Sequence, residues 1–593
     1  MKIIQSFKDY LIKKAGLQKA KDGLLKILSR EALEEAGRVL LDVLLIAREG
    51  RTLTFECPSN NSKFRKEDGV VIVRGEKESE GKIALIENNG KTIKINAWVK
   101  DLEPGDKVDL MEQTFDLTWK YIECLLSAQP GYPGWSHLSL FESALPAMPV
   151  LQETPNLGLA EEILKSLEAE AGKVLDLSQR AALLKAVPLP LLLGIQGPPG
   201  TGKTQALAFL AELLVRMGNR VMILSVTHQA TNNALSAIKQ MFPKRPIFKV
   251  ASKDNRESLH PNIKICGMKK LLEENGREEL NQTIIGCTMA SVLLQQSSSG
   301  RSQFSPTVLL VDEAGQVPFV DGMLLSLLGA GSLILFGDDA QMPPVFEDEL
   351  MAEPHAISMF AGLRKFYPRS IIPLNVTYRL NSRLCDLIGR NFYGPEVGLY
   401  SHPSNANLMF PYEIAPKDSR FLTAVLDPTL SIVWVPVDTV DCGEENEEEA
   451  RIAVQVIKAC MEDGVPVKEM VLVTPFRRQS ARIRDMLQEA TGTHLLPVID
   501  TVERVQGMTV DLVIYSLCCS DHELLQTRGG FLFSLNRLNV ALSRARTKVV
   551  ILASPHALNC LPSSFDGFKA RNTFRSILAF NCKKVDPEVR LLL

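Results

Sequence analysis

Apolar residues at the start of the chain recur at helical spacing. Between Ser6 and Ala47, leucines and isoleucines such as Leu24 and Leu28 alternate with Lys, Arg and Glu. This spacing gathers the apolar side chains on one face of a helix. We therefore expect residues 1–48 to form N-terminal helices, arranged as a stalk.

The pattern then changes to a period of two. Short runs at Val70–Val73, Ile83–Ile86 and Ile93–Ile95 are rich in β-branched residues, and Asn89-Gly90 between the last two favours a tight hairpin turn. Several short strands joined in this way predict a small antiparallel barrel. We place this accessory domain at residues 49–112.

Helical spacing returns at Phe115–Leu126 and is followed by a proline-rich connector, so residues 113–173 are expected to be a stalk helix and a linker. After about residue 174, buried strands alternate with helices, which is typical of parallel α/β layers. Nine strands are expected, at Leu191–Ile195, Val221–Val226, Thr283–Cys287, Val308–Val311, Ser332–Phe336, Ile432–Val435, Met470–Val473, Leu512–Leu517 and Val549–Leu552. They suffice for two domains, at 174–355 with an insertion at about 250–282, and at 356–593.

Composition narrows the class of protein. The net charge is -2, so a polyanionic partner must be held by a local groove and not by a globally basic surface. The eleven cysteines lack the spacing of zinc or iron–sulfur ligands, and no nuclease module is visible. The charged start and the short apolar run Met323–Phe336 argue against a signal peptide and a membrane span. We expect a cytoplasmic protein without a membrane partner, and a monomer.

A glycine-rich loop follows the apolar run that ends at Ile195. It consists of Gly197, Pro198, Pro199, Gly200, Thr201, Gly202, Lys203 and Thr204, and Gln205 leads into a helical pattern. In this context the glycines let backbone N–H groups close around a β-phosphate, while Lys203 reaches the β- and γ-phosphates. The Thr204 hydroxyl is then a ligand for Mg²⁺. The sequence predicts a MgATP site.

Two further strands end in groups suited to phosphate chemistry. Val308–Val311 runs into Asp312 and Glu313, where the first carboxylate can hold the Mg²⁺ shell and the second can polarise the attacking water. Another strand leads to Gln341, placed to sense the γ-phosphate. The pair of carboxylates favours hydrolysis over transfer to a small acceptor.

The order of these segments resembles the superfamily 1B helicases, in the branch that contains the nonsense-decay helicase and the nuclease-helicase of Okazaki-fragment processing. The resemblance covers about residues 174–555. Its motifs are Leu177–Gln179, Ser225–Leu235, Cys287-Thr288, Leu374–Arg379, Asn391–Gly394, Val473–Gln479, Thr501–Gly507 and Leu538–Arg546. The chain departs from the family at Asn232, usually acidic, and at Thr509, usually a glutamate that binds the nucleotide sugar.

The resemblance implies an α/β fold with two RecA-like P-loop domains and one ATP site between them. It implies that Gln179 reads adenine, Tyr378 stacks on adenine, Arg379 reaches the γ-phosphate, Gly507 belongs to the ATP site and Arg544 is the arginine finger. It also implies that a single strand is gripped through Thr227, His228, Thr288, Thr474 and Thr501, with movement from 5′ to 3′.

We therefore expect an ATP-dependent helicase or translocase on single-stranded nucleic acid. A nucleotide-gated clamp that binds without processive unwinding is the alternative, and a P-loop kinase of a small molecule is disfavoured because the second α/β half would have no role. The sequence leaves DNA and RNA open, since the 2′-hydroxyl contact has no sequence signature. The acidic run Glu444–Glu449 is interpreted as a solvated helix start.

Overall fold

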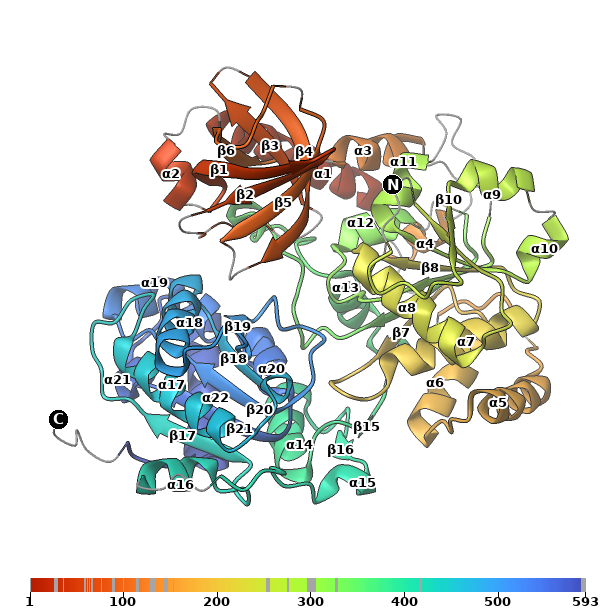
Figure 1. The fold of residues 1–593 in the computed structure, drawn as a ribbon. Helices are drawn as coiled ribbons and strands as arrows, with labels where there is room; N and C mark the ends of the chain where they lie inside the picture. The colour runs from red at the N-terminus through yellow and green to blue at the C-terminus, as the bar shows by residue number, and fades with distance from the viewer. Residues whose placement is uncertain are drawn as a thin grey trace. The chain divides into compact units, whose positions relative to one another are not determined.

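The computed structural model describes residues 2–25, 30–35, 37–57, 60, 62, 64, 68–75, 77–87, 91–99, 101–113, 117–127, 135–141, 148–152, 154–251, 256–274, 277–295, 305–325, 329–414 and 419–587. It divides into two compact units (Figure 1). One comprises Leu11–Trp119, and the other comprises Met1–Tyr10 with Lys120–Leu593. Each unit is described by itself below.

The smaller unit is built on a closed six-stranded antiparallel barrel in the order β1-β2-β5-β4-β3-β6. The strands are β1 (Val39–Glu49), β2 (Thr52–Glu56), β3 (Gly69–Arg74), β4 (Lys77–Glu87), β5 (Thr92–Ala97) and β6 (Lys107–Glu112). Alternate residues of β2, β3 and β5 are buried, because successive side chains of a strand point to opposite faces. The three strand runs expected from the sequence are confirmed, while Asn89-Gly90 lies outside the described residues.

The N-terminal prediction is wrong for its last part. Helices α1 (Lys2–Leu25) and α2 (Arg30–Glu35) are present, but β1 already begins at Val39, within the 1–48 segment expected to be helical. Its pairing shifts register twice, between Leu40 and Val43 and between Leu45 and Ala47. A bulge adds a residue and breaks the alternation of apolar and polar positions, which is why the sequence pattern misled.

In the larger unit, the first sheet has eight parallel strands in the order β10-β9-β11-β8-β12-β13-β7-β14. They are β7 (Leu192–Gln196), β8 (Val221–Ser225), β9 (Ile247–Val250), β10 (Lys264–Cys266), β11 (Ile284–Thr288), β12 (Val308–Val311), β13 (Ser332–Gly337) and β14 (Ile371–Pro373). The helices around it are α3 (Thr118–Ser127), α4 (Trp135–Ser139), α5 (Leu157–Ala171), α6 (Leu177–Ala186), α7 (Lys203–Arg216), α8 (His228–Met241), α9 (Met268–Glu274), α10 (Arg277–Asn281), α11 (Met289–Gln295), α12 (Phe319–Leu324) and α13 (Met359–Phe366).

A second parallel sheet of six strands follows, in the order β19-β18-β20-β21-β17-β22. Its strands are β17 (Ile432–Pro436), β18 (Met470–Thr474), β19 (Val498–Thr501), β20 (Val510–Ser516), β21 (Ala545–Ala553) and β22 (Lys583–Lys584). The short pair β15 (Val376–Thr377) and β16 (Tyr400–Ser401) lies between the two sheets in sequence. The helical segments are α14 (Ser382–Ile388), the π-helix η5 (Gly389–Tyr393), α15 (Pro403–Ala406), α16 (Arg420–Leu426), α17 (Glu447–Glu462), α18 (Arg477–Thr491), α19 (His522–Leu532), α20 (Leu535–Leu542), α21 (Pro555–Asn559) and α22 (Phe565–Asn581).

All nine predicted strands are present, because strands covered on both faces read as continuous apolar runs. Three boundaries differ from expectation. The 250–282 segment is more than an insertion, since β10 pairs with β9 and extends the sheet. The supposed linker includes α5, which packs into the first sheet's core. The first sheet also continues past residue 355, because β14 pairs with β7.

None of the helices in the part of the chain that the structure describes is long and apolar enough to cross a membrane.

Candidate active site between two parallel sheets

The glycine-rich loop connects the carboxyl end of β7 to the first turn of α7. Gly200 and Gly202 have φ values of 76° and 74°, a left-handed conformation that favours glycine. An added Cβ at Gly200 would lie 2.5 Å from the Arg379 Cβ, and one at Gly202 would lie 2.5 Å from the Gln179 amide nitrogen. The loop therefore needs glycine both for its backbone and for the side chains packed against it.

Lys203 faces the carboxylates at the end of β12. Its Nζ lies 2.8 Å from the Glu313 Oε1 and 3.8 Å from the Asp312 Oδ1. Burial lowers the pKa of Lys203, but the two carboxylates outweigh it and raise this pKa above its usual value. Burial raises the pKa of Asp312 to about 6, against the opposing effect of Lys203. The ammonium is thus held charged at the mouth of the loop.

Glu313 has an unusual backbone. Its φ is 53°, which is left-handed for a residue other than glycine, and its N–H donates to the Asp312 Oδ1 at 2.9 Å. Such conformations cost about 1–3 kcal/mol and persist where the surroundings impose them, often at functional sites. The strained turn keeps the partly exposed Glu313 carboxylate beside Lys203.

The donor set fits a nucleoside triphosphate with Mg²⁺. The left-handed glycines shape a loop whose backbone N–H groups can bind a phosphate, and Lys203 supplies a positive charge. The exposed Thr204 and the buried Asp312 supply oxygen atoms of the type that Mg²⁺ prefers. Bound there, the metal would neutralise phosphate charge. Within the described residues, no group of three or more His, Cys, Asp and Glu is arranged to hold a metal ion by itself.

Residues following β14 meet the glycine-rich loop. The Thr377 hydroxyl donates to the Pro199 carbonyl at 2.8 Å, and the Tyr378 N–H donates to the Gly200 carbonyl at 2.8 Å. Arg379 follows directly, and its guanidinium donates to the Ser543 carbonyl at 3.1 Å. Burial, with Arg544 and Arg546 nearby, lowers the pKa of Arg379 to about 9. This segment brings an arginine to the loop.

The predicted adenine contacts surround Asp176. The Tyr378 ring stacks on His402 with centroids 4.7 Å apart, and its hydroxyl donates to the Asp176 Oδ2 at 3.1 Å. The Gln179 amide is buried, donates to the Thr201 carbonyl at 3.0 Å and accepts from the Asp176 N–H at 3.2 Å. In this structure Gln179 braces the loop, while the exposed Tyr378 ring offers a face for stacking.

Arg544 lies at the end of α20, on the second sheet's side of the site. Its guanidinium is buried and donates to the Val540 carbonyl, the Met508 carbonyl and the Ser543 hydroxyl at 2.8, 3.4 and 3.2 Å. Burial lowers the pKa of Arg544 to about 10, and the charge of Glu313 acts in the opposite direction. Gly507, the last of the residues predicted to belong to the ATP site, has a φ of 85°, and no atom lies within 4 Å of the position that a Cβ would occupy.

A polar network that the sequence did not predict joins the two sheets at Gln341. The Gln341 amide donates to the Asp338 Oδ2 at 2.5 Å, and the Tyr393 hydroxyl donates to the same oxygen at 2.5 Å. From α20, the Asn539 amide donates to the Ala340 carbonyl and to the Tyr393 oxygen at 2.8 and 2.9 Å. The predicted γ-phosphate sensor is thus held by groups from both halves of the unit.

These network residues lie inside segments singled out in the sequence, but their roles were missed. Asp338 belongs to the turn before Gln341, and Tyr393 and Asn539 belong to two of the helicase-like motifs. The residue types in the sequence indicated that hydrogen bonding was possible, since Asp, Tyr and Asn can each bridge two polar groups. Nothing in the sequence indicated that these three residues lie close together, because their proximity depends on how the two sheets meet.

We expect Tyr393→Phe to move the acid limb of the kcat–pH profile to higher pH. Burial raises the pKa of Asp338 to about 6, and the Tyr393 hydrogen bond counteracts that rise. Without the hydroxyl, Asp338 takes up a proton at higher pH and releases Gln341. The check is the pH dependence of kcat, with Tyr367→Phe as control, since that hydroxyl donates to the Leu140 carbonyl instead. Equal pH profiles of kcat for wild type and Tyr393→Phe would contradict the idea that the Tyr393 hydroxyl keeps Asp338 ionised and Gln341 in place.

The residues predicted to contact the nucleic-acid strand lie at or just after the carboxyl ends of β8, β11, β18 and β19. Thr288 pairs in register with Ser225, which precedes Thr227, and Thr474 pairs with Thr501. Thr227 is exposed and caps α8 by accepting from the Ala230 N–H, and His228 is half-buried.

The other three hydroxyls differ from expectation. Thr288, Thr474 and Thr501 are buried, and the Thr288 Oγ1 lies 2.8 Å from the Ser291 Oγ. As the structure stands, these side chains support the sheet edge and do not reach the surface. Each of the three is the last residue of its strand, β11, β18 or β19.

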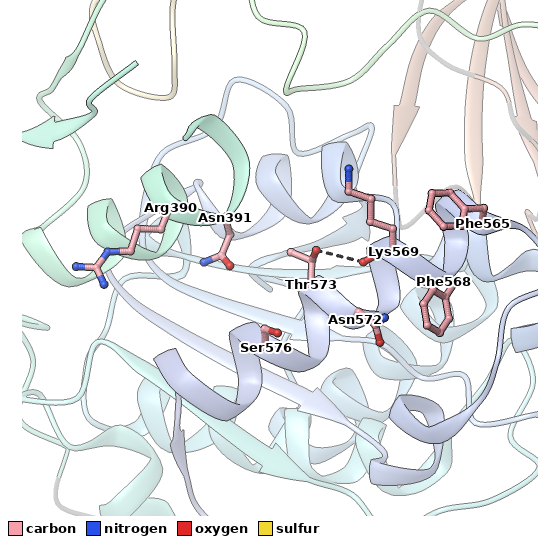
Figure 2. A pocket seen from close by; sticks show the side chains of 8 residues that line it. All are labelled: Arg390, Asn391, Phe565, Phe568, Lys569, Asn572, Thr573 and Ser576. Carbon is pink, nitrogen blue, oxygen red and sulfur yellow. Dashed lines mark hydrogen bonds between the residues drawn. The ribbon is translucent and has the colours of Figure 1, made fainter. Parts of the chain in front are cut away.

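A separate open hollow lies on the second half of the unit, between η5 and α22 (Figure 2). Its volume is about 430 Å³, and it is lined by Arg390, Asn391, Phe565, Phe568, Lys569, Asn572, Thr573 and Ser576. The Thr573 hydroxyl donates to the Lys569 carbonyl at 3.2 Å, so this side chain is engaged by its own helix. None of the predicted site residues lines this hollow.

Comparison with known proteins shows which families and proteins the chain is similar to. Two family models, each described as an AAA domain, match residues 179–347 and 355–556. The DNA replication ATP-dependent helicase/nuclease JHS1 of Arabidopsis thaliana is 27% identical over 403 residues, covering 66% of this chain and 29% of that protein. The human DNA replication ATP-dependent helicase/nuclease DNA2 is 27% identical over 423 residues, covering 66% and 38%.

Among solved structures, an arterivirus nonstructural protein 10 helicase covers 86% of this chain and 76% of its own at 16% identity, with a TM-score of 0.37, a likeness too loose to carry an argument. The chain spans only about a third of the length of the curated relatives named above. The chain is therefore similar to proteins with AAA domains and to the two ATP-dependent helicase/nucleases named above.

Proposed function

We propose that the chain is an ATP-driven helicase or translocase on single-stranded nucleic acid. In this proposal the two sheets are the cores of two RecA-like domains, and the barrel is an accessory domain on a helical stalk. The chain then belongs to the helicase branch that contains the nonsense-decay and Okazaki-processing helicases. The observation that carries the proposal is the phosphate loop at which Lys203 meets Glu313 and against which Arg379 packs. Arg544 follows Ser543, whose carbonyl accepts from Arg379.

The chemistry follows from these residues. Lys203 binds the terminal phosphates, Glu313 accepts a proton from the attacking water, and Arg379 and Arg544 stabilise the negative charge that develops on the transferred group. Bound Mg²⁺, held through Thr204 and Asp312, would supply electrostatic neutralisation. Because the arginines come from the second half, hydrolysis depends on how the halves close, and this dependence couples it to movement along a strand.

The relatives favour DNA as the substrate, since their names assign them to DNA replication. Movement from 5′ to 3′ is part of the proposal through the family resemblance. The relatives also carry a nuclease activity in their names, and we assign none to this chain.

We expect single-stranded oligonucleotide to stimulate ATP hydrolysis, and we expect a duplex with a 5′ tail to be unwound in preference to one with a 3′ tail. The assay measures phosphate release and strand separation with matched DNA and RNA oligomers. Tight binding without strand separation would support a clamp instead of a motor. Hydrolysis that ignores the strand would contradict both.

A further inference from the structure

The acidic run Glu444–Glu449 is more than a solvated helix start. Asn446 caps α17, and its backbone forms two hydrogen bonds with the buried side-chain amide of Gln479. The Asn446 N–H donates to the Gln479 Oε1 at 2.8 Å, and the Gln479 Nε2 donates to the Asn446 carbonyl at 3.1 Å. The buried Glu449 accepts from the Ser516 hydroxyl and the Cys518 N–H at 2.7 and 2.9 Å. The run is therefore fixed at the carboxyl edge of the second sheet, where β18 and β20 end.

Its outer members face arginines of two other helices. A single carboxylate, that of Glu444, lies 3.8 Å from the Arg478 Nε of α18 and 3.4 Å from the Arg528 Nη1 of α19. Glu447 accepts from the Arg482 Nε and Nη2 at 2.8 and 2.9 Å. The three arginine side chains keep 59%, 57% and 45% of their surface exposed, in the order Arg478, Arg528, Arg482.

We propose that Arg478, Arg482 and Arg528 form a phosphate-contact surface for the single strand, and that Glu444 and Glu447 occupy this surface until a strand displaces them. The inference rests on the proposed function and adds to it a binding surface and a carboxylate that competes with the ligand.

The magnitudes favour displacement. Exposed ion pairs contribute about 0–1 kcal/mol and are screened by salt, whereas each phosphate contact with a cation releases condensed counterions. A strand can therefore replace the carboxylates at low cost.

The test compares charge-neutral variants by fluorescence anisotropy of a labelled single-stranded DNA oligomer at several salt concentrations. Glu444→Gln should bind about 2- to 5-fold more tightly than wild type, because an exposed pair of up to about 1 kcal/mol no longer has to be broken. Arg528→Ala should bind more weakly and should flatten the slope of log K against log salt by about 0.7, the value for one phosphate contact on a single strand.

Matched controls lie elsewhere in the same half. Glu462→Gln removes the same charge from the other end of α17, where that residue pairs with Lys458, and Arg390→Ala removes an exposed arginine that pairs with Asp386. Neither should change the affinity or the salt slope. Melting temperatures show whether each variant is folded.

The outcomes are separable from those of the proposed function. If wild type does not bind the oligomer, the proposed function fails. If wild type binds but Glu444→Gln behaves like Glu462→Gln, or Arg528→Ala leaves the salt slope unchanged, the phosphate-contact surface is wrong and the helicase proposal stands.

Discussion

Glu313→Gln should bind ATP and lose nearly all turnover. Glutamine keeps the size of the side chain and can still contact Lys203, but its amide does not accept a proton from water at neutral pH. Proton transfer by a positioned side chain contributes about 10²- to 10⁴-fold to a rate. We expect kcat for oligonucleotide-stimulated hydrolysis to fall by about that factor.

The geometry favours Glu313 over its neighbour Asp312 as the proposed base. Asp312 is buried, and its Oδ1 accepts from the Glu313 N–H, whereas the Glu313 carboxylate reaches out from a left-handed backbone into the mouth of the loop. The measurement pairs steady-state phosphate release with binding of a fluorescent ATP analogue. Glu273→Gln, on the exposed helix α9, is the control. Hydrolysis at the wild-type rate in Glu313→Gln would remove the assignment.

Much of the fold could be predicted because buried parallel strands are long apolar runs with turn residues at both ends. Each of the nine expected strands belongs to one of the two sheets. The failures have local causes. β1 has two register shifts, and Asp42 within it has a φ of 51°, so its apolar residues do not alternate. β14 has only three residues and ends in Pro373, which leaves little pattern to detect.

The candidate site was predictable to the extent that its groups lie at fixed distances along the sequence. The phosphate loop and the Asp312-Glu313 pair each follow a strand, and parallel strands place their carboxyl ends at one edge. Tyr393 and Asp338 are 55 positions apart, and Asn539 and Tyr393 are 146 apart. Their hydrogen bonds exist only because two sheets with separate cores meet, which no local pattern encodes.

Arg544→Ala should lower kcat by about 10³-fold or more, as the loss of an arginine finger does elsewhere, while ATP binding is largely kept. In this structure the guanidinium is satisfied by acceptors of its own half, the carbonyls of Val540 and Met508 and the Ser543 hydroxyl. Arg544 follows Ser543, whose carbonyl accepts from Arg379 beside the phosphate loop, so we propose that closing of the two halves brings the Arg544 guanidinium to the reacting phosphate.

Arg544→Lys separates charge from geometry. Lysine keeps the positive charge but lacks the planar fork that binds two phosphate oxygens at once, so we expect most of the loss in kcat to remain. Single-turnover hydrolysis and binding of a fluorescent ATP analogue should be measured for both variants. The melting temperature is the check on folding, because alanine removes a donor from the Val540 and Met508 carbonyls. If either variant changed only the affinity for nucleic acid, Arg544 would be a nucleic-acid contact and not an arginine finger. A different residue would then have to couple hydrolysis to closure of the two halves.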